Sequence, residues 1–407
     1  MESRRVFLQA AAGAAVVSQR VLGANDRIRM AVIGTGTRGT IDNRLFRKHA
    51  DCEFVAACDV RKSRLDALVK TLPGKVDSYG DYRRILERKD IDAVLVTTPD
   101  HWHSPITVEA CAAGKDVYVE KPLSNTIPAA QRMVEAARKY NRVVQLGTQQ
   151  RTGPHFQEAG KLVQDGYIGK VNHCVMYQPG GYGRVMQPTE APPADLDWEM
   201  FQGPAPRRPY SPSRLGWRAF YDYGGGLVTD WGVHLADIVM MYMKADSKGP
   251  LLTSATAQYI YSAKDLEQVP DTFSCSWQYD DFVMSFTNIV PPNEAGNMQG
   301  NWFFGQRGVL HVNRSGYQVW PVRGGAARGA QPPPPIEAKN VPITENYEDD
   351  PDTTAHARNF LDCVKSRKRP TSDVEIGFNS TLPTLIALLA IRQGRAFAWD
   401  GKTAKPV

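Results

Sequence analysis

A glycine-rich turn directly after the first apolar run most constrains the fold of this 407-residue chain. The run at 28–33 has the composition of a buried strand, and helical residues follow the turn from Ile41. In such a turn the first glycine permits the tight bend, the second lets the backbone approach a pyrophosphate, and the third allows close packing of helix and strand. The pattern predicts a strand–turn–helix unit that binds a dinucleotide. The residues expected around the phosphates are Gly34, Thr35, Gly36, Thr37, Arg38 and Gly39.

A carboxylate follows the next apolar run. Asp59 comes directly after residues 54–58, where a carboxylate accepts hydrogen bonds from an adenosine ribose and repels a 2′-phosphate. The position therefore favours NAD over NADP. NADP stays possible, because Arg61 and Lys62 are close enough to meet a phosphate. The structural alternative for Asp59 is a helix N-cap before Arg61.

Short apolar runs alternate with helical stretches as far as residue 150. The runs are 28–33, 54–58, 93–97, 117–119 and 143–146. This alternation predicts a doubly wound parallel sheet, a Rossmann fold of the α/β class. Beyond residue 170 apolar and polar residues alternate with period two, which is typical of a sheet with one packed face. Because 407 residues exceed one ordinary core, the length indicates two domains or one domain with a large addition. We expect two domains, at 27–150 and 151–407. A surface loop is expected from Gly324 to Pro335.

The first 24 residues have the pattern of a removable export signal. Arg4 and Arg5 precede a weakly apolar stretch at 10–17, and Ala24 offers a small residue for cleavage. This arrangement resembles a twin-arginine signal and predicts a periplasmic or otherwise exported protein. The stretch is shorter than the roughly 20 residues that span a membrane, so no stable membrane insertion is expected after processing. A frayed helix and an uncleaved anchor are the alternatives.

Charge and cysteine spacing argue against several other classes of protein. The formal net charge is +6. It falls to about +4 without the first 24 residues, and no helix carries a basic stripe, so no nucleic-acid partner is expected. The six cysteines lack the paired spacing of zinc sites and are predicted to be packed thiols. His101 and His103 have no accompanying cluster of ligands, so no metal site is expected.

Polar side chains follow two of the later runs. Thr98, Pro99 and His103 come after the run at 93–97, and Glu120 and Lys121 come after the run at 117–119. In a doubly wound sheet the carboxyl ends of the strands open onto the crevice that holds the glycine turn. These five residues are therefore expected to contact the cofactor, and Lys121 adds a cation to the crevice.

Several motifs occur in the same order as in the Gfo/Idh/MocA oxidoreductases. The chain resembles that family over nearly its whole length, from Ile28 to about Trp399. Glu-Lys-Pro, beginning at Glu120, is the short motif of that family. The run from Gly147 to Arg151 and the residues 360–363 look like its exported members. Within the first of these runs, Gln149 is expected to contact the cofactor.

The resemblance implies a second, α+β domain built on a large, mostly antiparallel sheet. It also implies a cofactor held across the first domain, and homodimers or homotetramers formed through the sheet. In the family the lysine that matches Lys121 assists proton transfer, and the glutamate that matches Glu120 holds the loop. Without the resemblance, Lys121 would be interpreted as a solvated surface residue.

One segment after a glycine run carries the remaining chemical candidates. A helix is expected to begin near Asp230, which places Asp230 and His234 on one face and Asp237 a turn further on, suited to hold the imidazole or to cap a neighbouring element. This spacing is similar to the catalytic helix of the family's polyol and sugar dehydrogenases. His234 is expected to take the hydroxyl proton, because its ordinary pKa lies nearest neutral pH. Asp230 would orient the hydroxyl or tune His234, and Lys121 would favour the developing alkoxide. A surface pair on a helix is the alternative.

Aromatic and cationic residues upstream fit a carbohydrate substrate. Trp217 and Tyr182 offer stacking faces and Arg218 a bidentate donor, which suit a sugar ring with one apolar face and a rim of hydroxyls. Together with Asp230 and His234 they form the expected substrate site. Packing between the domains is the alternative for the aromatic residues.

These expectations lead to three hypotheses about function. The first is an NAD(P)-dependent oxidoreductase that transfers a hydride between the nicotinamide and a secondary hydroxyl of a sugar, glycoside or cyclitol. The second, taken from relatives of the resembled family, is an NAD-dependent glycoside hydrolase that oxidises a ring carbon transiently and keeps its cofactor. The third is a catalytically silent binding protein, against which the joint presence of Lys121, Asp230 and His234 argues.

Overall fold

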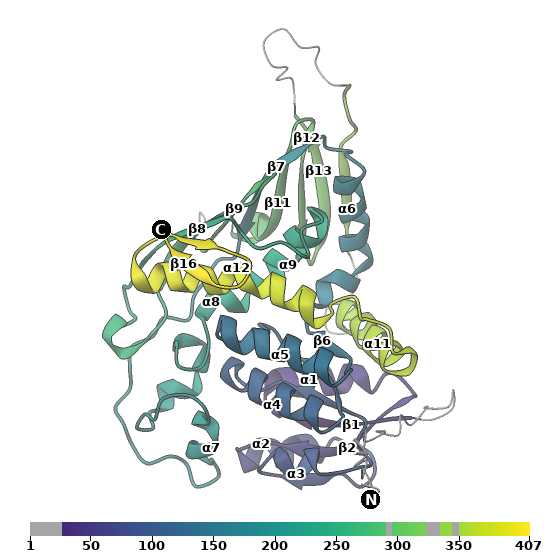
Figure 1. Ribbon diagram of the computed structural model, residues 1–407, viewed down its shortest axis with the longest axis vertical. Coiled ribbons are helices and arrows are strands. Elements are labelled where there is room, and N and C mark those ends of the chain that lie inside the picture. The colour runs from purple at the N-terminus through teal and green to yellow at the C-terminus, as the bar shows by residue number, and fades with distance from the viewer. Residues whose placement is uncertain (1–26, 290–294, 323–333, 344–349) are drawn as a thin grey trace, which may run out of the picture.

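The structure, a computed structural model, describes residues 27–289, 295–322, 334–343 and 350–407. The export signal expected at 1–24 lies outside the described residues, as does most of the loop expected from Gly324 to Pro335. Two sheets organise the molecule, one in its lower part and one in its upper part as drawn in Figure 1.

The first sheet has six parallel strands in the order β3-β2-β1-β4-β5-β6. The strands are β1 (Ile28–Ile33), β2 (Cys52–Cys58), β3 (Asp77–Tyr79), β4 (Ala93–Val96), β5 (Asp116–Val119) and β6 (Val144–Leu146). The helices between them are α1 (Thr37–Phe46), α2 (Lys62–Val69), α3 (Arg83–Leu86), α4 (Asp100–Ala112) and α5 (Ile127–Lys139). The strand order turns back between β1 and β4, and such a switch point opens a crevice at the carboxyl ends of the strands. The predicted doubly wound sheet is confirmed.

The second sheet has ten strands in the order β14-β13-β12-β11-β7-β10-β9-β8-β15-β16. They are β7 (Val171–Tyr177), β8 (Leu252–Gln258), β9 (Thr272–Gln278), β10 (Val283–Thr287), β11 (Gly300–Gly305), β12 (Gly308–Asn313), β13 (Gly316–Pro321), β14 (Lys339–Pro342), β15 (Phe397–Trp399) and β16 (Ala404–Pro406). Strands β7 and β10 pair in parallel, whereas β9, β11 and β12 pair with their neighbours antiparallel. The expected large, mostly antiparallel sheet is confirmed.

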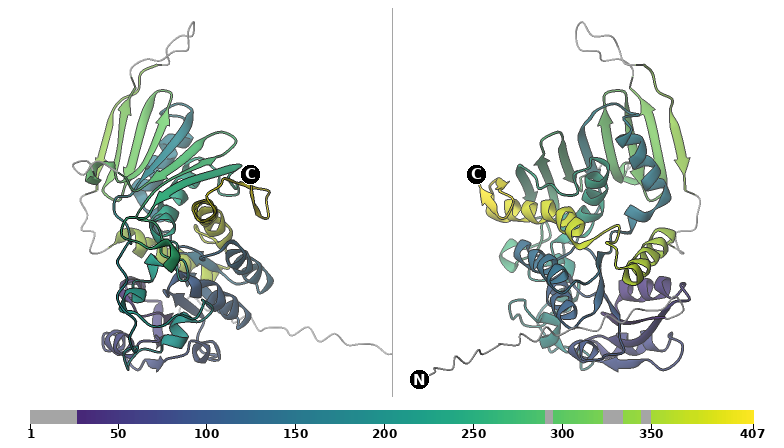
Figure 2. Two further views of the ribbon diagram at one scale, coloured as in Figure 1. Left: turned by 90° about the vertical axis from the view of Figure 1, so that its left-hand side faces the viewer. Right: turned by 45° about the vertical axis from the view of Figure 1, so that its right-hand side comes forward.

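Helices cover one face of the second sheet. Figures 1 and 2 show α6 (Pro154–Gln164), α9 (Gly232–Tyr242) and α12 (Val374–Gln393) on that side. The inward side chains of β9, Phe273, Cys275 and Trp277, are buried in this layer, whereas Ser274 on the opposite face is exposed. The alternation of apolar and polar residues in the sequence therefore predicts which face of the sheet is packed.

Two late helices connect the two sheets. The helix α11 (Pro351–Ser366) returns to the first sheet, where Phe360 packs edge-on against Phe46 and Tyr118 at ring distances of 6.1 and 5.8 Å. Residues beyond 150 thus pack on both sheets. Helix α12 has the length and apolarity of a membrane span, but 72% of that stretch is buried inside the protein. It is a core helix that contacts α5, α9 and β8.

Short elements complete the chain. They are α7 (Trp198–Gln202), α8 (Gly226–Asp230), α10 (Ala295–Met298) and the 3-10 turns η1 (Gln149–Thr152), η2 (Pro212–Leu215), η3 (Trp217–Ala219) and η4 (Lys264–Leu266). All six cysteines are free and buried, which confirms the prediction of packed thiols.

Candidate functional site

The glycine turn has the shape that a dinucleotide requires. Gly34 has φ of +94°, and a Cβ there would lie 2.8 Å from the backbone carbon of Thr97 at the end of β4. A Cβ at Gly39 would lie 2.1 Å from the carbonyl oxygen of Gly34, so α1 packs tightly on the turn. At Gly36, which caps α1, the nearest atom to a Cβ is Arg64 Nη1 at 3.8 Å. No side chain of the described residues caps α1, so its first amides are available to an anion.

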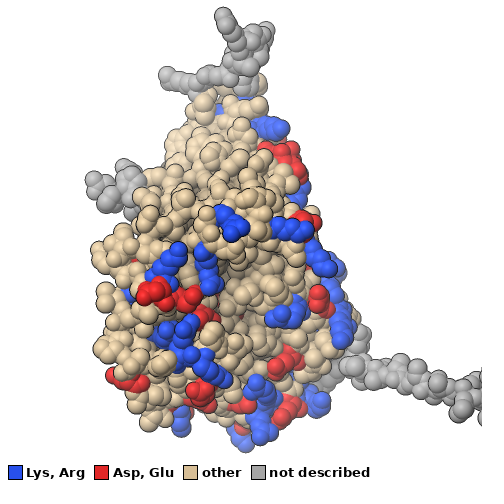
Figure 3. Space-filling model, turned by 60° about the vertical axis from the view of Figure 1, so that its left-hand side comes forward, with Lys and Arg blue, Asp and Glu red and all other residues tan. Residues whose placement is uncertain are grey.

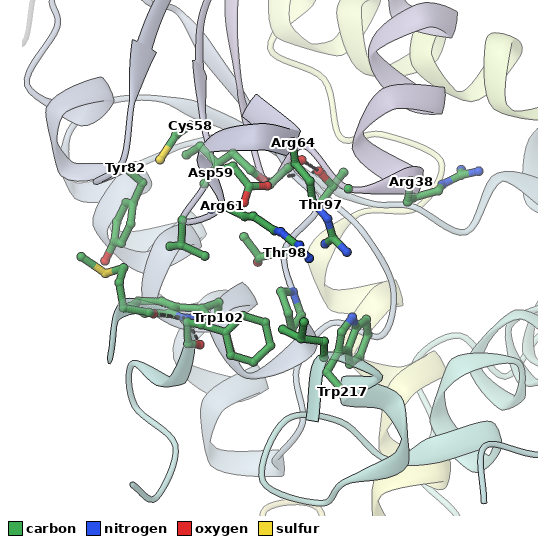
Figure 4. A pocket seen from close by; sticks show the side chains of 18 of the residues that line it. Arg38, Cys58, Asp59, Arg61, Arg64, Tyr82, Thr97, Thr98, Trp102 and Trp217 are labelled. Carbon is green, nitrogen blue, oxygen red and sulfur yellow. Dashed lines mark hydrogen bonds between the residues drawn. The ribbon is translucent and has the colours of Figure 1, made fainter. Parts of the chain in front are cut away.

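A cavity of about 520 Å³ lies in front of this turn. Figure 4 shows Asp59 on one side of the cavity, Trp102 and Trp217 on the other, and the side chains of Arg61 and Arg64 extending between them. The expected cofactor contacts that line it are Gly34, Gly36, Thr37, Arg38, Asp59, Thr98 and Pro99. The shape of the turn and this lining fit the phosphates and adenosine of NAD.

Asp59 holds the glycine turn as well as facing the cavity. Its Oδ2 accepts hydrogen bonds from the Thr35 amide at 2.6 Å and the Thr35 hydroxyl at 3.0 Å. Its Oδ1 accepts from the Arg61 amide at 2.8 Å. The N-cap of α2 is Arg61, with no side-chain cap hydrogen bond, so the alternative of a helix N-cap at Asp59 is wrong. Thr35 therefore supports the turn from behind, because it is buried and does not line the cavity.

Arg38 links the glycine turn to the loop after β5. Its Nε donates to Glu120 Oε1 at 3.1 Å, and its guanidinium pairs with the buried Asp42 at 3.0 Å. In Figure 4 its side chain extends away from the other labelled residues. Glu120 Oε2 also accepts from the Lys121 amide at 3.3 Å. Glu120 thus holds its own loop and stays outside the cavity lining.

His103 has a different position from the one expected. It lies in the first turn of α4 and is 1% exposed. Its ring nitrogens contact the carbonyl oxygens of Pro122 at 2.7 Å and Thr98 at 2.9 Å. Because both nitrogens are engaged by backbone, His103 joins the loops after β4 and β5 and does not present a polar atom to a cofactor.

Three donors, from residues 12, 48 and 109 positions before it, converge on Asp230. Lys121 Nζ donates to Asp230 Oδ1 at 2.5 Å, and Arg218 Nε donates to the same oxygen at 2.9 Å. The Tyr182 hydroxyl donates to Asp230 Oδ2. Burial raises the pKa of the Asp230 carboxyl, but the charges of Lys121 and Arg218 outweigh it and hold that pKa well below its usual range. Asp230 is therefore an ionised carboxylate at neutral pH.

His234 lies beside this cluster and is 5% exposed. Among the described residues its buried Nδ1 has no hydrogen-bond partner. Burial first, and then the charge of Lys121, lower the pKa of His234 well below its ordinary value. The imidazole is therefore neutral at neutral pH and has a nitrogen able to accept a proton.

Two expectations about this segment were wrong in detail. A helix, α9, does begin near Asp230, at Gly232, but Asp230 and His234 do not share it. Asp230 is the last residue of the preceding helix α8, and His234 belongs to α9. Asp237 does not hold the imidazole. Its carboxylate accepts two hydrogen bonds of 2.8 Å from Arg151 and one of 2.6 Å from Ser380, and it ties η1 and α12 to α9.

Arg218 joins the cluster to the cavity. Its Nε contacts Asp230, and its guanidinium lies 4.2 Å from the Trp217 ring centre, where both residues line the cavity. Lys121, Asp230, Tyr182 and His234 are not part of that lining. Gln149 also stays outside it, in η1, with a buried Oε1 that has no partner among the described residues.

Several site residues were missed by sequence reasoning. Tyr82, Leu196, Met200 and Phe201 line the cavity, although no spacing in the sequence connects them. Asp100 follows Pro99 directly and is 1% exposed, and burial raises the pKa of its carboxyl well above the usual range. A charged residue at the carboxyl end of a strand was the available signal for Asp100. Among the described residues no group of three or more potential ligands is arranged to hold a metal ion.

Comparisons with known proteins identify two regions of the chain. Residues 28–148 match the NAD-binding Rossmann fold of the Gfo/Idh/MocA oxidoreductases, and residues 157–286 match the C-terminal alpha/beta domain of the same family. The first region is thus an NAD-binding domain, as the glycine turn and Asp59 predicted.

Individual curated relatives match over about a third of the chain. Myo-inositol 2-dehydrogenase of Thermotoga maritima is 33% identical over 143 residues, which are 35% of this chain and 42% of that protein. A glycosyl hydrolase family 109 protein of Shewanella putrefaciens is 29% identical over 156 residues, which are 36% of this chain and 34% of that protein. The chain thus spans less than half the length of these curated relatives.

A solved structure matches the fold over most of the chain. The WlbA dehydrogenase of Bordetella pertussis, solved with NADH and UDP-GlcNAcA, has a TM-score of 0.63 and 18% sequence identity. The match covers 92% of this chain and 99% of that one. At this identity the likeness concerns the two-sheet architecture.

Proposed function

We propose, from the premise that the chain belongs to the Gfo/Idh/MocA oxidoreductase family, that it oxidises a secondary hydroxyl of a sugar, glycoside or cyclitol with NAD. One observation carries the proposal. Lys121, from the edge of the NAD-binding sheet, reaches the Asp230 carboxylate of the second part of the chain at 2.5 Å, and Arg218 connects this pair to the cofactor cavity.

The residues divide the proton chemistry among them. The neutral imidazole of His234 takes the hydroxyl proton of the substrate. The Lys121 ammonium lies where it stabilises the alkoxide that develops as the proton leaves. Asp230 fixes Lys121, Arg218 and Tyr182 in one arrangement through three hydrogen bonds. When bound, NAD supplies the nicotinamide that accepts the hydride.

A ring-shaped polyol suits the surroundings of this cluster. The Trp217 ring lines the cavity, and the Arg218 guanidinium lies 4.2 Å from the centre of that ring. An aromatic face packs on the apolar face of a sugar ring, and a guanidinium donates to its hydroxyls. The match to a myo-inositol dehydrogenase supports the same substrate class.

Glycoside hydrolysis is the second candidate, supported by the match to a family 109 glycosyl hydrolase. In that reaction the ring carbon is oxidised, the substituent is eliminated, water adds and the hydride returns. A single measurement distinguishes the two candidate functions. A screen of cyclitols, aldoses and aryl glycosides should show net NADH absorbance for a dehydrogenase, and cleavage without net NADH for a hydrolase.

We also propose that the protein is a homo-oligomer through the uncovered face of the ten-stranded sheet. On that face Trp302 stacks on His311 at 4.4 Å and on Trp320 at 5.5 Å, and Phe304 is 38% exposed. Figure 3 shows few charged side chains over the upper part of the molecule, where this sheet lies. Exposed aromatic clusters of this kind are typical of interfaces.

Export by the twin-arginine route is a further proposal, supported by Arg4, Arg5 and the apolar stretch after them. Replacing both arginines by lysine should leave the full-length protein in the cytoplasmic fraction, while the unchanged chain reaches the periplasm. Equal export of the two forms would remove this proposal without affecting the enzymatic one.

A further inference from the structure

A segment from the second half of the chain lies across the NAD-binding domain. Residues 195–203, here called the strap, contain the short helix α7 and belong to the connection between β7 and α8. Figure 1 shows α7 low in the molecule, beside the first sheet and far from the second. Leu196, Trp198 and Phe201 pack in a small core of their own with Phe220 and Tyr223. The strap is therefore a packed element with a hydrophobic core of its own.

One end of the strap is fastened to the start of α2. The Lys62 amide donates to the Asp195 carbonyl at 2.8 Å, and the Asp197 amide donates to the Val60 carbonyl at 2.9 Å. The Asp195 carboxylate also accepts from the Ser63 hydroxyl and, at 3.4 Å, from Arg61 Nε. These contacts lie directly after Asp59, the residue expected to face the adenosine ribose.

The other end is fastened to α4. Trp102 Nε1 donates to the carbonyls of Met200 at 3.1 Å and Phe201 at 3.0 Å, and His101 Nε2 lies 2.9 Å from the Phe201 carbonyl. Gly203 has φ of +48°, and a Cβ there would lie 2.0 Å from the Trp102 ring. The fit leaves no room for a side chain at this point.

Between the two ends the strap forms a wall of the cavity. Leu196, Met200 and Phe201 line it together with Tyr82 and Trp102 of the NAD-binding domain. The Tyr82 and Trp102 rings are 5.6 Å apart, and Figure 4 shows Trp102 across the cavity from Asp59. An apolar, aromatic chamber beside the ribose carboxylate suits an adenine ring.

We infer that the strap completes the adenine pocket and retains the dinucleotide from one turnover to the next. The inference rests on the proposed use of NAD. Because the strap is hydrogen-bonded to the NAD-binding domain at both ends, the adenosine half leaves only when one end detaches. Asp195 is the best residue to replace in a test, since its side chain fastens the strap without lining the cavity.

The test measures how fast bound NADH leaves the purified full-length protein. The protein is loaded with NADH and chased with excess NAD, and the loss of NADH fluorescence gives the dissociation rate. Asp195→Ala should dissociate about tenfold faster or more, because it removes two hydrogen bonds that close the pocket. Ser63→Ala, an exposed change that removes one of them, should give a smaller increase. Glu199→Ala is the matched control, because the Glu199 side chain is 74% exposed and pairs with Arg207, which lies just beyond the strap.

The outcomes separate this inference from the proposed function. The inference is supported if NADH leaves the unchanged protein more slowly than the enzyme turns over. Asp195→Ala and Ser63→Ala must then accelerate dissociation, and Glu199→Ala must not. Tight NADH binding with the same rate in all four proteins overturns it and leaves the oxidoreductase proposal standing. No binding of NADH or NADPH by the unchanged protein overturns both. If Asp195→Ala fails to fold, Ser63→Ala alone decides.

Discussion

Lys121 illustrates how a surface-like residue becomes a chemical one. By itself a lysine after a strand is ordinary, yet here its side chain is 10% exposed and reaches a carboxylate 109 residues further along the chain. The pair is surrounded by Arg218 and Tyr182, so the carboxylate stays ionised and the ammonium stays in place. Position and charge together give this lysine its proposed role.

Removing the Lys121 ammonium should therefore affect turnover far more than cofactor binding. We expect Lys121→Ala to lower kcat by about 10²-fold or more, since a positioned proton-transfer or charge-stabilising group contributes that much. NADH affinity should change little, because Lys121 does not line the cavity. Steady-state rates and an NADH titration check this, with the exposed Lys161→Ala as control. Equal rates in both variants would contradict the role of Lys121.

The low pKa of His234 sets the direction of the pH dependence. Burial and the charge of Lys121 favour the neutral imidazole, so the folded protein keeps its base deprotonated at neutral pH. Activity should fall only as acid protonates His234, at a pH below the ordinary imidazole value of about 6.5. The acid limb of kcat/KM against pH measures this. A limb centred above that value, or one that persists in His234→Gln, would count against His234 as the base.

At the scale of elements, the strands were predictable where apolar residues run continuously. The runs at β1, β2, β4, β5 and β6 are buried on both faces, and such strands are visible in a single sequence. Strand β3 was missed because its three residues, Asp77–Tyr79, are mostly polar and only partly buried. The strap was missed because α7 has five residues and no periodicity precedes it.

The site was predictable in its residues more than in its contacts. Lys121, Asp230, Tyr182 and Arg218 were all named from the sequence, and the structure brings them together. Their geometry depends on how the two sheets are placed, which local patterns do not encode. For the same reason Asp237 was paired with the wrong partner, since Arg151 lies in a distant turn.

The Arg151–Asp237 pair should be a major support of the second part of the chain. Arg151 is 3% exposed and Asp237 is fully buried, so removing Asp237 takes a buried carboxylate from Arg151 and leaves it with Asp246, whose side chain is 35% exposed. Asp237→Ala should lower the free energy of unfolding by about 3–5 kcal/mol. Urea unfolding measures the change, and Asp165→Ala, which breaks an exposed pair, should alter it by less than about 1 kcal/mol. A small loss for Asp237→Ala would show that the interior solvates Arg151 by other means.

At the scale of the whole molecule, the two sheets have different tasks. The parallel sheet presents its carboxyl edge to the cofactor cavity, and the ten-stranded sheet supports α9 on one face while leaving aromatic residues on the other. Helix α12 lies between them and contacts both parts. The strap adds a second connection, which places residues of the second part of the chain within the cofactor cavity.

The uncovered face of the ten-stranded sheet should control assembly. Replacing Trp320, which is 40% exposed, by glutamate introduces a charge at the proposed interface and should shift the protein to monomers. Sedimentation velocity gives the mass of each form, and Tyr261→Glu, on an exposed residue outside the sheet, is the control. A monomeric unchanged protein, or an oligomer that tolerates Trp320→Glu, would show that this face serves another purpose.

The central claim is that the cavity in front of the glycine turn holds NAD, and one substitution tests it most directly. A Cβ at Gly36 meets only Arg64 at 3.8 Å, so Gly36→Val has room to fold while its side chain occupies the place of the pyrophosphate. NADH is titrated into both proteins by tryptophan-to-NADH energy transfer, with melting temperatures compared alongside. We predict one NADH per chain for the unchanged protein, and a loss of affinity of about 100-fold or more for Gly36→Val at an unchanged melting temperature. Equal binding by the two proteins, or none by the unchanged one, would contradict the claim.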